Sequence, residues 1–207
     1  MTAVMGDAGP RNDKMTDVNI PLIDLRRWRR GTPAARRALA RRVDRACRET
    51  GFLIVAGHGV PASAVRGARE AARAFFALAP AEKRRAARPG VTRGWVAVGD
   101  EALSYSLGRR TPPDLNESFQ IGPLDGRGGP NPWPARPRAL KPAWTRYSRE
   151  MERVAGELQS LFAAALGLPE DWFADKFDRH ESRLRARYYP AQAVPPLPGQ
   201  LDRKSVV

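Results

Sequence analysis

The segment Gly51 to Pro61, GFLIVAGHGVP, constrains the fold of this chain most, because a short apolar run ends in glycines and a proline. The run Phe52 to Val55 has the length of a buried strand and is too short for a helix. The Gly-His-Gly sequence around His58 predicts a tight turn, and Pro61 favours the start of a new helix. We therefore expect a strand, a turn and a helix in succession.

Amphipathic patterns on both sides of this segment predict three helices. Thr32 and Pro33 are typical of an N-cap and a first helical residue, and Gly51 marks the end of that helix. A second helix follows Pro61 and breaks near Pro80, and a third runs from about Pro142 to Leu166 and ends at Gly167. The residues expected to face inward are Ala35, Leu39, Val43, Ala46 and Cys47 in the first helix, Val65, Ala68, Ala72, Phe75 and Phe76 in the second, and Trp144, Tyr147, Met151, Val154, Leu158, Leu161, Phe162 and Ala165 in the third.

Short apolar or alternating segments predict the remaining strands. These are Ile20 to Leu25, Trp95 to Val98, Phe119 to Ile121 and Arg183 to Tyr189. The segment PEDWFADKF, which starts at Pro169, predicts one further short helix. Residues 1–17 show no apolar periodicity, so we interpret them as a disordered leader, and we recognise neither an internal repeat nor a second domain boundary.

The formal net charge of +14 raises the question of a nucleic-acid partner. All but five of the 36 basic residues are arginine, and they fall on the polar faces of the expected helices rather than in one block with aromatic residues. This distribution argues against nucleic acid as a partner. The alternative from a different class is a short, non-catalytic basic module that binds acidic partners. Steeply salt-dependent binding to bulk DNA would favour that alternative.

The sequence contains no apolar run of about 18 residues and no secretory h-region, which predicts a cytoplasmic protein without a membrane anchor. Cys47 is the only cysteine, so no internal disulfide can form. Its place among the apolar residues of the first helix predicts a small core residue rather than a nucleophile.

The residues alone assemble no catalytic or metal-binding site. His58 and His180 are the only histidines, and neither has the spacing of a metal ligand to a second imidazole. We expect a turn-forming role for His58 and a role at the surface or at a helix end for His180. The glycine-rich stretch from Gly126 to Gly129 lacks the lysine and helix of a phosphate loop, and no Ser-His-Asp order or carboxylate pair stands out.

Six segments in order nevertheless resemble the N-terminal half of isopenicillin N synthase-like, iron(II)- and 2-oxoglutarate-dependent dioxygenases. The segments are IPLIDL, ACRETGFLIVAGHGVP, AARAFFALAPAEK, TRGWVAVGDEAL, DLNESFQIG and LRARYYPAQ. The resemblance covers nearly all of residues 20–201. It implies an α+β fold: the N-terminal helix and strand region of a double-stranded β-helix (jelly-roll) dioxygenase, with most of the jelly roll truncated.

The resemblance also implies a chemistry for an intact parent enzyme. Such enzymes hold iron(II) with a His-x-Asp…His triad and use 2-oxoglutarate and dioxygen to oxidise a small molecule, releasing succinate and CO2. The outcome is hydroxylation, desaturation, ring closure or ethylene formation, and some relatives use no 2-oxo acid. No His-x-Asp occurs in these 207 residues, so we expect this chain to lack the metal site, to bind no cofactor and to be inactive.

One site residue can be carried over from the family. The tyrosine before the proline of its YYP motif donates a hydrogen bond to a carboxylate of 2-oxoglutarate, and the matching residue is Tyr189. Arg185 and Arg187 occupy alternate positions on the same expected strand, so all three should share one face. We therefore predict Tyr189 as a cofactor-binding residue and Arg185 and Arg187 as substrate-binding candidates.

The final hexapeptide, Asp202 to Val207, departs abruptly from the family pattern. We interpret it as a tail that does not belong to the natural protein, which leaves residues 18–201 as the dioxygenase region. A naturally decayed, non-catalytic relative is the third possibility. The oligomeric state stays open.

Overall fold

The computed structural model describes residues 20–88, 93–101, 112–191 and 195–197, so the expected leader and tail lie outside the described residues. The chain forms two compact units, which we treat separately. The first unit comprises Met1–His58 and Leu158–Trp172, and the second comprises Gly59–Glu157 and Phe173–Val207. No helix within the described ranges is long and apolar enough to span a bilayer.

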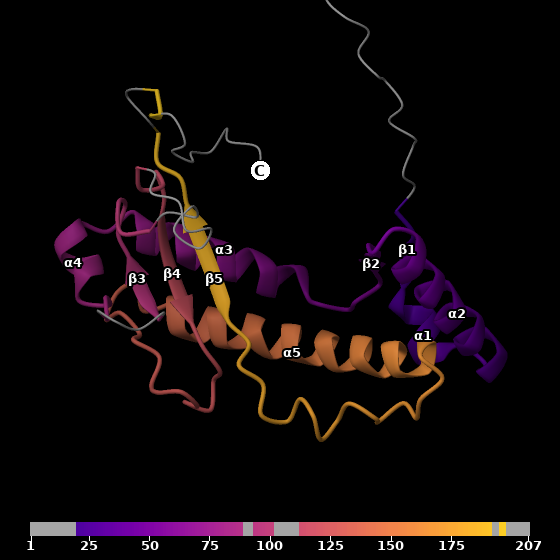
Figure 1. Cartoon of the computed structure of the whole chain (residues 1–207). Helices are drawn as coiled ribbons and strands as arrows, with labels where there is room; N and C mark the ends of the chain where they lie inside the picture. The colour runs from indigo at the N-terminus through magenta and orange to yellow at the C-terminus, as the bar shows by residue number, and fades with distance from the viewer. Residues whose placement is uncertain (1–19, 89–92, 102–111, 192–194, 198–207) are drawn as a thin grey trace, which may run out of the picture. The chain divides into compact units, whose positions relative to one another are not determined.

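The elements follow the order that the sequence predicts, with additions (Figure 1). They are β1 (Leu22–Asp24), α1 (Leu25–Arg30), α2 (Pro33–Glu49), β2 (Ile54–Ala56), α3 (Ala62–Phe76), α4 (Pro80–Arg84), β3 (Gly94–Val96), β4 (Glu117–Ile121), α5 (Leu140–Ala165) and β5 (Leu184–Tyr188).

In the first unit, β1 and β2 form a two-stranded parallel sheet. Leu22 lies opposite Ile54, and Ile23 lies opposite Val55. The strand β1 passes directly into α1 because the Asp24 side chain accepts a hydrogen bond from the Arg26 N–H, which caps the helix. The fully buried Ile23 shows that one face of this sheet is covered.

The boundaries of α2 agree with the prediction, and its N-cap is Thr32, whose hydroxyl accepts from the Ala35 N–H. Two of its expected core residues are wrong: Ala35 and Cys47 are exposed, whereas Ala40 is buried. Cys47 lies one turn beyond Val43 on the same side of the helix. Its exposure therefore reflects its place in the last turn of α2, where the described residues do not cover that side.

The buried strand expected at Phe52 to Val55 is also partly wrong. The strand β2 starts at Ile54, and the side chains of Phe52 and Ile54 are 68% and 52% exposed. An apolar run indicates a strand that is covered on both faces. Here the described residues cover only one face, so alternate apolar side chains stay in contact with solvent.

In the second unit, β3, β4 and β5 form an antiparallel sheet with β4 in the centre. All five residues of β4 are buried. One face of this sheet packs on aromatic residues from α3 and α5, and the Trp144 indole donates to the Ala68 carbonyl at 3.1 Å. Figure 1 shows the three strands beside these two helices. The aromatic cluster contains Phe75, Phe76, Trp95, Phe119 and Trp144.

The strands and helices predicted between Gly59 and Tyr189 are confirmed within a few residues, whereas the short helix expected after Pro169 is wrong. That segment forms isolated turns, among them the Trp172 N–H to Pro169 carbonyl contact at 3.0 Å. Gly167, with a positive φ of 73°, ends α5 as expected, because a left-handed residue there lets the Leu168 N–H reach the Ala163 carbonyl.

Candidate functional site

The two faces of β5 have different partners. Leu184 and Ala186 pack against the aromatic cluster, and the Tyr188 ring stacks on Phe76 with centroids 5.4 Å apart. Alternation along a strand therefore turns Arg185 and Arg187 to the opposite face of the sheet. The side-chain alternation that the sequence predicts for this strand is present.

Arg185 is held by the protein itself. Its guanidinium donates to the Ser118 hydroxyl at 2.8 Å and forms an ion pair with Glu101. Ser118 is on the central strand and is almost fully buried. Arg185 thus links β5 to β4 and to the residues that follow β3. Its predicted role in substrate binding stays a prediction.

Arg187 and Tyr189 occupy the neighbouring positions. Arg187 lies opposite Ser118 in the strand register and is exposed, and no ion pair joins it to another described residue. Tyr189 is half-buried and lies one residue beyond β5, before Pro190. A cationic side chain and a phenol at this end of β5 are groups that can bind a carboxylate. We call the set Ser118, Gln120, Arg185, Arg187 and Tyr189 the polar sheet face.

The other face of β4 carries a buried ion pair that sequence reasoning missed. Glu117 accepts from the Lys83 ammonium at 2.8 Å and from the Trp95 indole at 2.6 Å, and Lys83 also donates to the Phe76 carbonyl. Both charged side chains are 7% exposed. A signal existed: Glu117 lies two residues before Phe119, so it occupies the core face of a strand and needs a buried partner.

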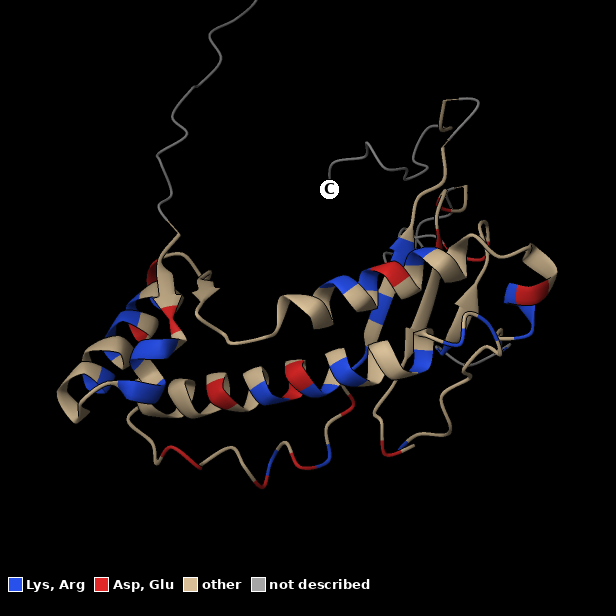
Figure 2. Cartoon of the chain, turned by 180° about the vertical axis from the view of Figure 1, so that it is seen from behind, with Lys and Arg blue, Asp and Glu red and all other residues tan. Residues whose placement is uncertain are grey.

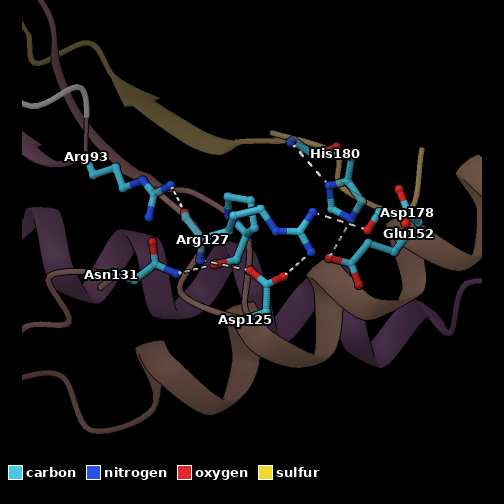
Figure 3. Close-up of polar contacts among 9 residues, drawn as sticks. Arg93, Asp125, Arg127, Asn131, Glu152, Asp178 and His180 are labelled. Atoms are coloured by element: carbon cyan, nitrogen blue, oxygen red, sulfur yellow. Dashed lines mark hydrogen bonds and ion pairs between the residues drawn. The ribbon is translucent and has the colours of Figure 1, made fainter. Parts of the chain in front are cut away.

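A second polar cluster fastens the segment that leads into β5 (Figure 3). The Arg127 guanidinium pairs with Asp125 at 2.6 Å and donates to the Asp178 carbonyl, while Arg93 donates to the Arg127 carbonyl. The Arg127 backbone N–H, at 2.9 Å, and then its guanidinium lower the pKa of Asp125 from its usual value. His180 lies 4.0 Å from a carboxylate oxygen of Glu152.

The described residues bring no candidate metal site together. The described residues contain no group of three or more His, Cys, Asp and Glu side chains that could hold a metal ion. His58 lies after β2 in a segment without regular structure, between Gly57 and Gly59, which both have positive φ, and His180 lies before β5. The turn-forming role expected for His58 and the surface or helix-end role expected for His180 remain predictions.

Basic side chains are numerous on α1 and α2, whereas along α5 they are interspersed with acidic ones (Figure 2). On α5, Arg153 pairs with both Glu150 and Glu157. Arg36 of α2 stacks on the Trp28 ring at 4.1 Å and pairs with Glu170. Several of the arginines are therefore neutralised within the fold.

A protein-family model described as the N-terminal region of the non-haem dioxygenase in morphine synthesis matches residues 20–136. The chain belongs to this family. The resemblance to isopenicillin N synthase-like, iron(II)- and 2-oxoglutarate-dependent dioxygenases is thereby confirmed.

Curated relatives agree with the family match. Validamycin A dioxygenase of Streptomyces hygroscopicus subsp. limoneus is 31% identical over 184 residues, which cover 84% of this chain and 50% of the relative. Gibberellin 20 oxidase 1 of Oryza sativa subsp. japonica is 29% identical and is covered to 51%. The chain thus spans about half the length of the curated relatives it matches.

Solved structures confirm the predicted fold class. A full-length Neurospora crassa protein in complex with alpha-KG superposes with a TM-score of 0.70 at 25% identity, over 81% of this chain and 53% of that structure. JOX2 in complex with 2OG, Fe and JA gives 0.64 at 27% identity, over 83% and 48%. The chain has the fold of the N-terminal helix and strand region of jelly-roll dioxygenases and corresponds to about half of each of these structures.

Proposed function

We propose that this chain is the N-terminal part of an iron(II)- and 2-oxoglutarate-dependent dioxygenase that oxidises a small molecule with dioxygen. The observation that carries the proposal is the family match over residues 20–136, which precedes a strand that ends at Tyr188, next to Tyr189. The reaction releases succinate and CO2 and hydroxylates, desaturates or cyclises its substrate, or forms ethylene. The relatives' named activities support the class of reaction.

The polar sheet face fits the 2-oxo acid better than the metal. 2-Oxoglutarate supplies the two electrons that dioxygen activation needs and carries a negative charge at both ends. The Tyr189 hydroxyl is proposed to donate to one of its carboxylates, and Arg187 places a positive charge on the same face. Arg185 orients this end of β5 through Ser118 and Glu101.

Iron does not fit the residues present. A ferrous site needs about three convergent protein ligands with open positions left over. The sequence has no His-x-Asp, and its two histidines are far apart in sequence. We therefore propose that residues 1–207 alone bind no stoichiometric iron and form no succinate.

Anaerobic calorimetry tests this proposal on the 207-residue chain and on the protein from the reading frame continued downstream. We expect stoichiometric iron(II) and 2-oxoglutarate binding by the longer protein only. In that protein, Tyr189→Phe should weaken 2-oxoglutarate binding by about 1 kcal/mol, the size of one lost hydrogen bond. The matched control is Tyr188→Phe, because Tyr188 stacks on Phe76 on the opposite face. Tight one-to-one iron binding by the short chain would overturn the proposal.

A further inference from the structure

A pocket of about 360 Å3 lies along one side of α2 in the first unit. Its apolar lining consists of Trp28 of α1, Pro33 and Ala40 of α2, and Ala164 and Ala165 at the end of α5. Trp28 and Ala40 are buried, so packing fixes this lining in place. The volume is within the range of small-molecule sites in proteins. We call this cavity the α2 pocket.

Charged side chains complete the lining of the α2 pocket. They are Arg36, Arg37, Arg41, Asp44 and Glu170. Both lining carboxylates already have a cationic partner. Asp44 pairs with Arg48 at 2.8 Å, and Glu170 pairs with Arg36. The acidic side chains therefore leave the charge of the remaining arginines uncompensated.

Those remaining arginines are Arg37 and Arg41. Both are exposed, and no ion pair or hydrogen bond joins either of them to another described residue. They are four residues apart on α2, which places them on one side of the helix, where like charges repel and destabilise it. An oxyanion bound between the two guanidinium groups would remove this repulsion and accept charge-assisted hydrogen bonds from both.

The third arginine of the pocket has a different role. The Arg36 guanidinium lies 4.1 Å from the centre of the Trp28 ring and is paired with Glu170, so it is held within the fold. It forms part of a fixed wall and leaves anion binding to the other two arginines. Methyl groups of Ala40, Ala164 and Ala165 line the same cavity and offer an apolar surface to the rest of a ligand.

We propose that the α2 pocket binds a small organic oxyanion, namely a phosphate or carboxylate attached to a compact apolar group. Arg37 and Arg41 hold the oxyanion, and the alanine side of the pocket accommodates the apolar group. The pocket belongs to the first unit and shares no residue with the polar sheet face of the second. This site is therefore additional to the proposed dioxygenase function and does not depend on it.

NMR titration of the 207-residue chain with phenyl phosphate, benzoate and inorganic phosphate tests the proposal. A salt concentration of about 0.15 M screens diffuse attraction to the basic surface. We expect saturable shifts of the Trp28 indole N–H and of the α2 amides with phenyl phosphate or benzoate, and the tighter ligand identifies the oxyanion. Inorganic phosphate should bind about tenfold more weakly, because it buries no apolar surface.

The decisive variant is Arg37→Gln/Arg41→Gln, which should weaken binding of the tighter ligand by about tenfold or more. The matched control, Arg42→Gln/Arg45→Gln, removes the same charge from exposed positions of α2 that do not line the pocket. It should change the affinity by less than about twofold at this salt concentration. All four side chains are exposed, so both variants should keep the circular dichroism of the wild type.

A third variant, Ala165→Leu, keeps both arginines and narrows the apolar side of the pocket. It should weaken binding of phenyl phosphate and leave that of inorganic phosphate unchanged. Shifts that do not saturate, equal affinities for phenyl phosphate and inorganic phosphate, or equal losses in the two double variants would overturn the proposal. None of these measurements needs iron or 2-oxoglutarate, so failure of the dioxygenase proposal would leave them unaffected.

Discussion

The two sheets of this chain are built from similarly short apolar strands, but their faces are buried to different extents by the described residues. In the antiparallel sheet, the central strand β4 is buried at every residue, with aromatic residues on one face and Arg185 on the other. In the parallel sheet, Ile23 is fully buried while Leu22, next to it, is half exposed. The comparison teaches that the sequence of a strand specifies which side chains lie on each of its two faces. Whether a face is buried depends on which segments are available to cover it.

The difference follows from where the covering elements come from. The antiparallel sheet takes its cover from α3 and from the part of α5 that precedes Leu158, which belong to the same compact unit. For the parallel sheet, the described residues provide cover on the inner face only. If this account is right, substitutions in the two sheets should have very different effects on the free energy of unfolding.

The sharpest contrast is between two phenylalanines. Phe119 of β4 is fully buried and contacts Phe75 and Trp144 at centroid distances of 4.8 and 5.3 Å, whereas Phe52 is 68% exposed. Phe119→Ala should lower the free energy of unfolding by about 4 kcal/mol through the lost burial and the cavity left behind. Phe52→Ala should change it by less than about 0.5 kcal/mol in the 207-residue chain. Urea unfolding of both variants measures this, and equal losses would break the comparison.

The next effect concerns the buried ion pair behind β4. Lys83→Met removes the charge that Glu117 needs, and an unpaired buried carboxylate should cost about 3 kcal/mol. The double variant Lys83→Met/Glu117→Gln should recover most of that loss, because the amide oxygen still accepts from the Trp95 indole. Denaturant unfolding of the single and double variants gives the coupling. A double variant as unstable as the single one would show that packing, not charge, holds this site.

The smallest effect lies at the exposed end of β1. The Arg26 guanidinium and then the Arg26 backbone N–H lower the pKa of Asp24 from 3.8 to about 2. Because the pKa is depressed in the folded state, its stabilising contribution is present above pH 3.8 and is lost as the pH falls towards 2. NMR titration should show the low midpoint, and Arg26→Gln should raise it. A wild-type midpoint at the ordinary value would contradict the ion pair.

The sequence predicted where the helices and strands lie better than which of their side chains are buried. Periodicity located α2, α3 and α5, and Gly167 marked the end of α5. It missed α1, because a six-residue helix with four arginines shows no apolar period although Trp28 is buried. It also placed Cys47 in the core, because an apolar period gives the buried side of a helix but not how far along the helix that side is covered.

Periodicity also predicted part of the candidate site. The period of two on β5 correctly grouped Arg185 with Arg187 on one face. The sequence could not show that Arg185 donates to Ser118 and forms an ion pair with Glu101. Those contacts depend on strand register and on a segment distant in sequence. The roles of Tyr189 and Arg187 toward a ligand stay predictions.

The burial of Lys83 has a consequence for the chemistry of its amine. Acylating and alkylating reagents attack the uncharged, accessible form of a lysine, and Lys83 is shielded by Glu117 and the Trp95 ring. Lys141 and Lys176 are exposed and are open to the same reagents at all times. Modification of Lys83 must therefore wait for the strand β4 to separate from α4. The rate at which this amine is labelled would report how often the second unit opens.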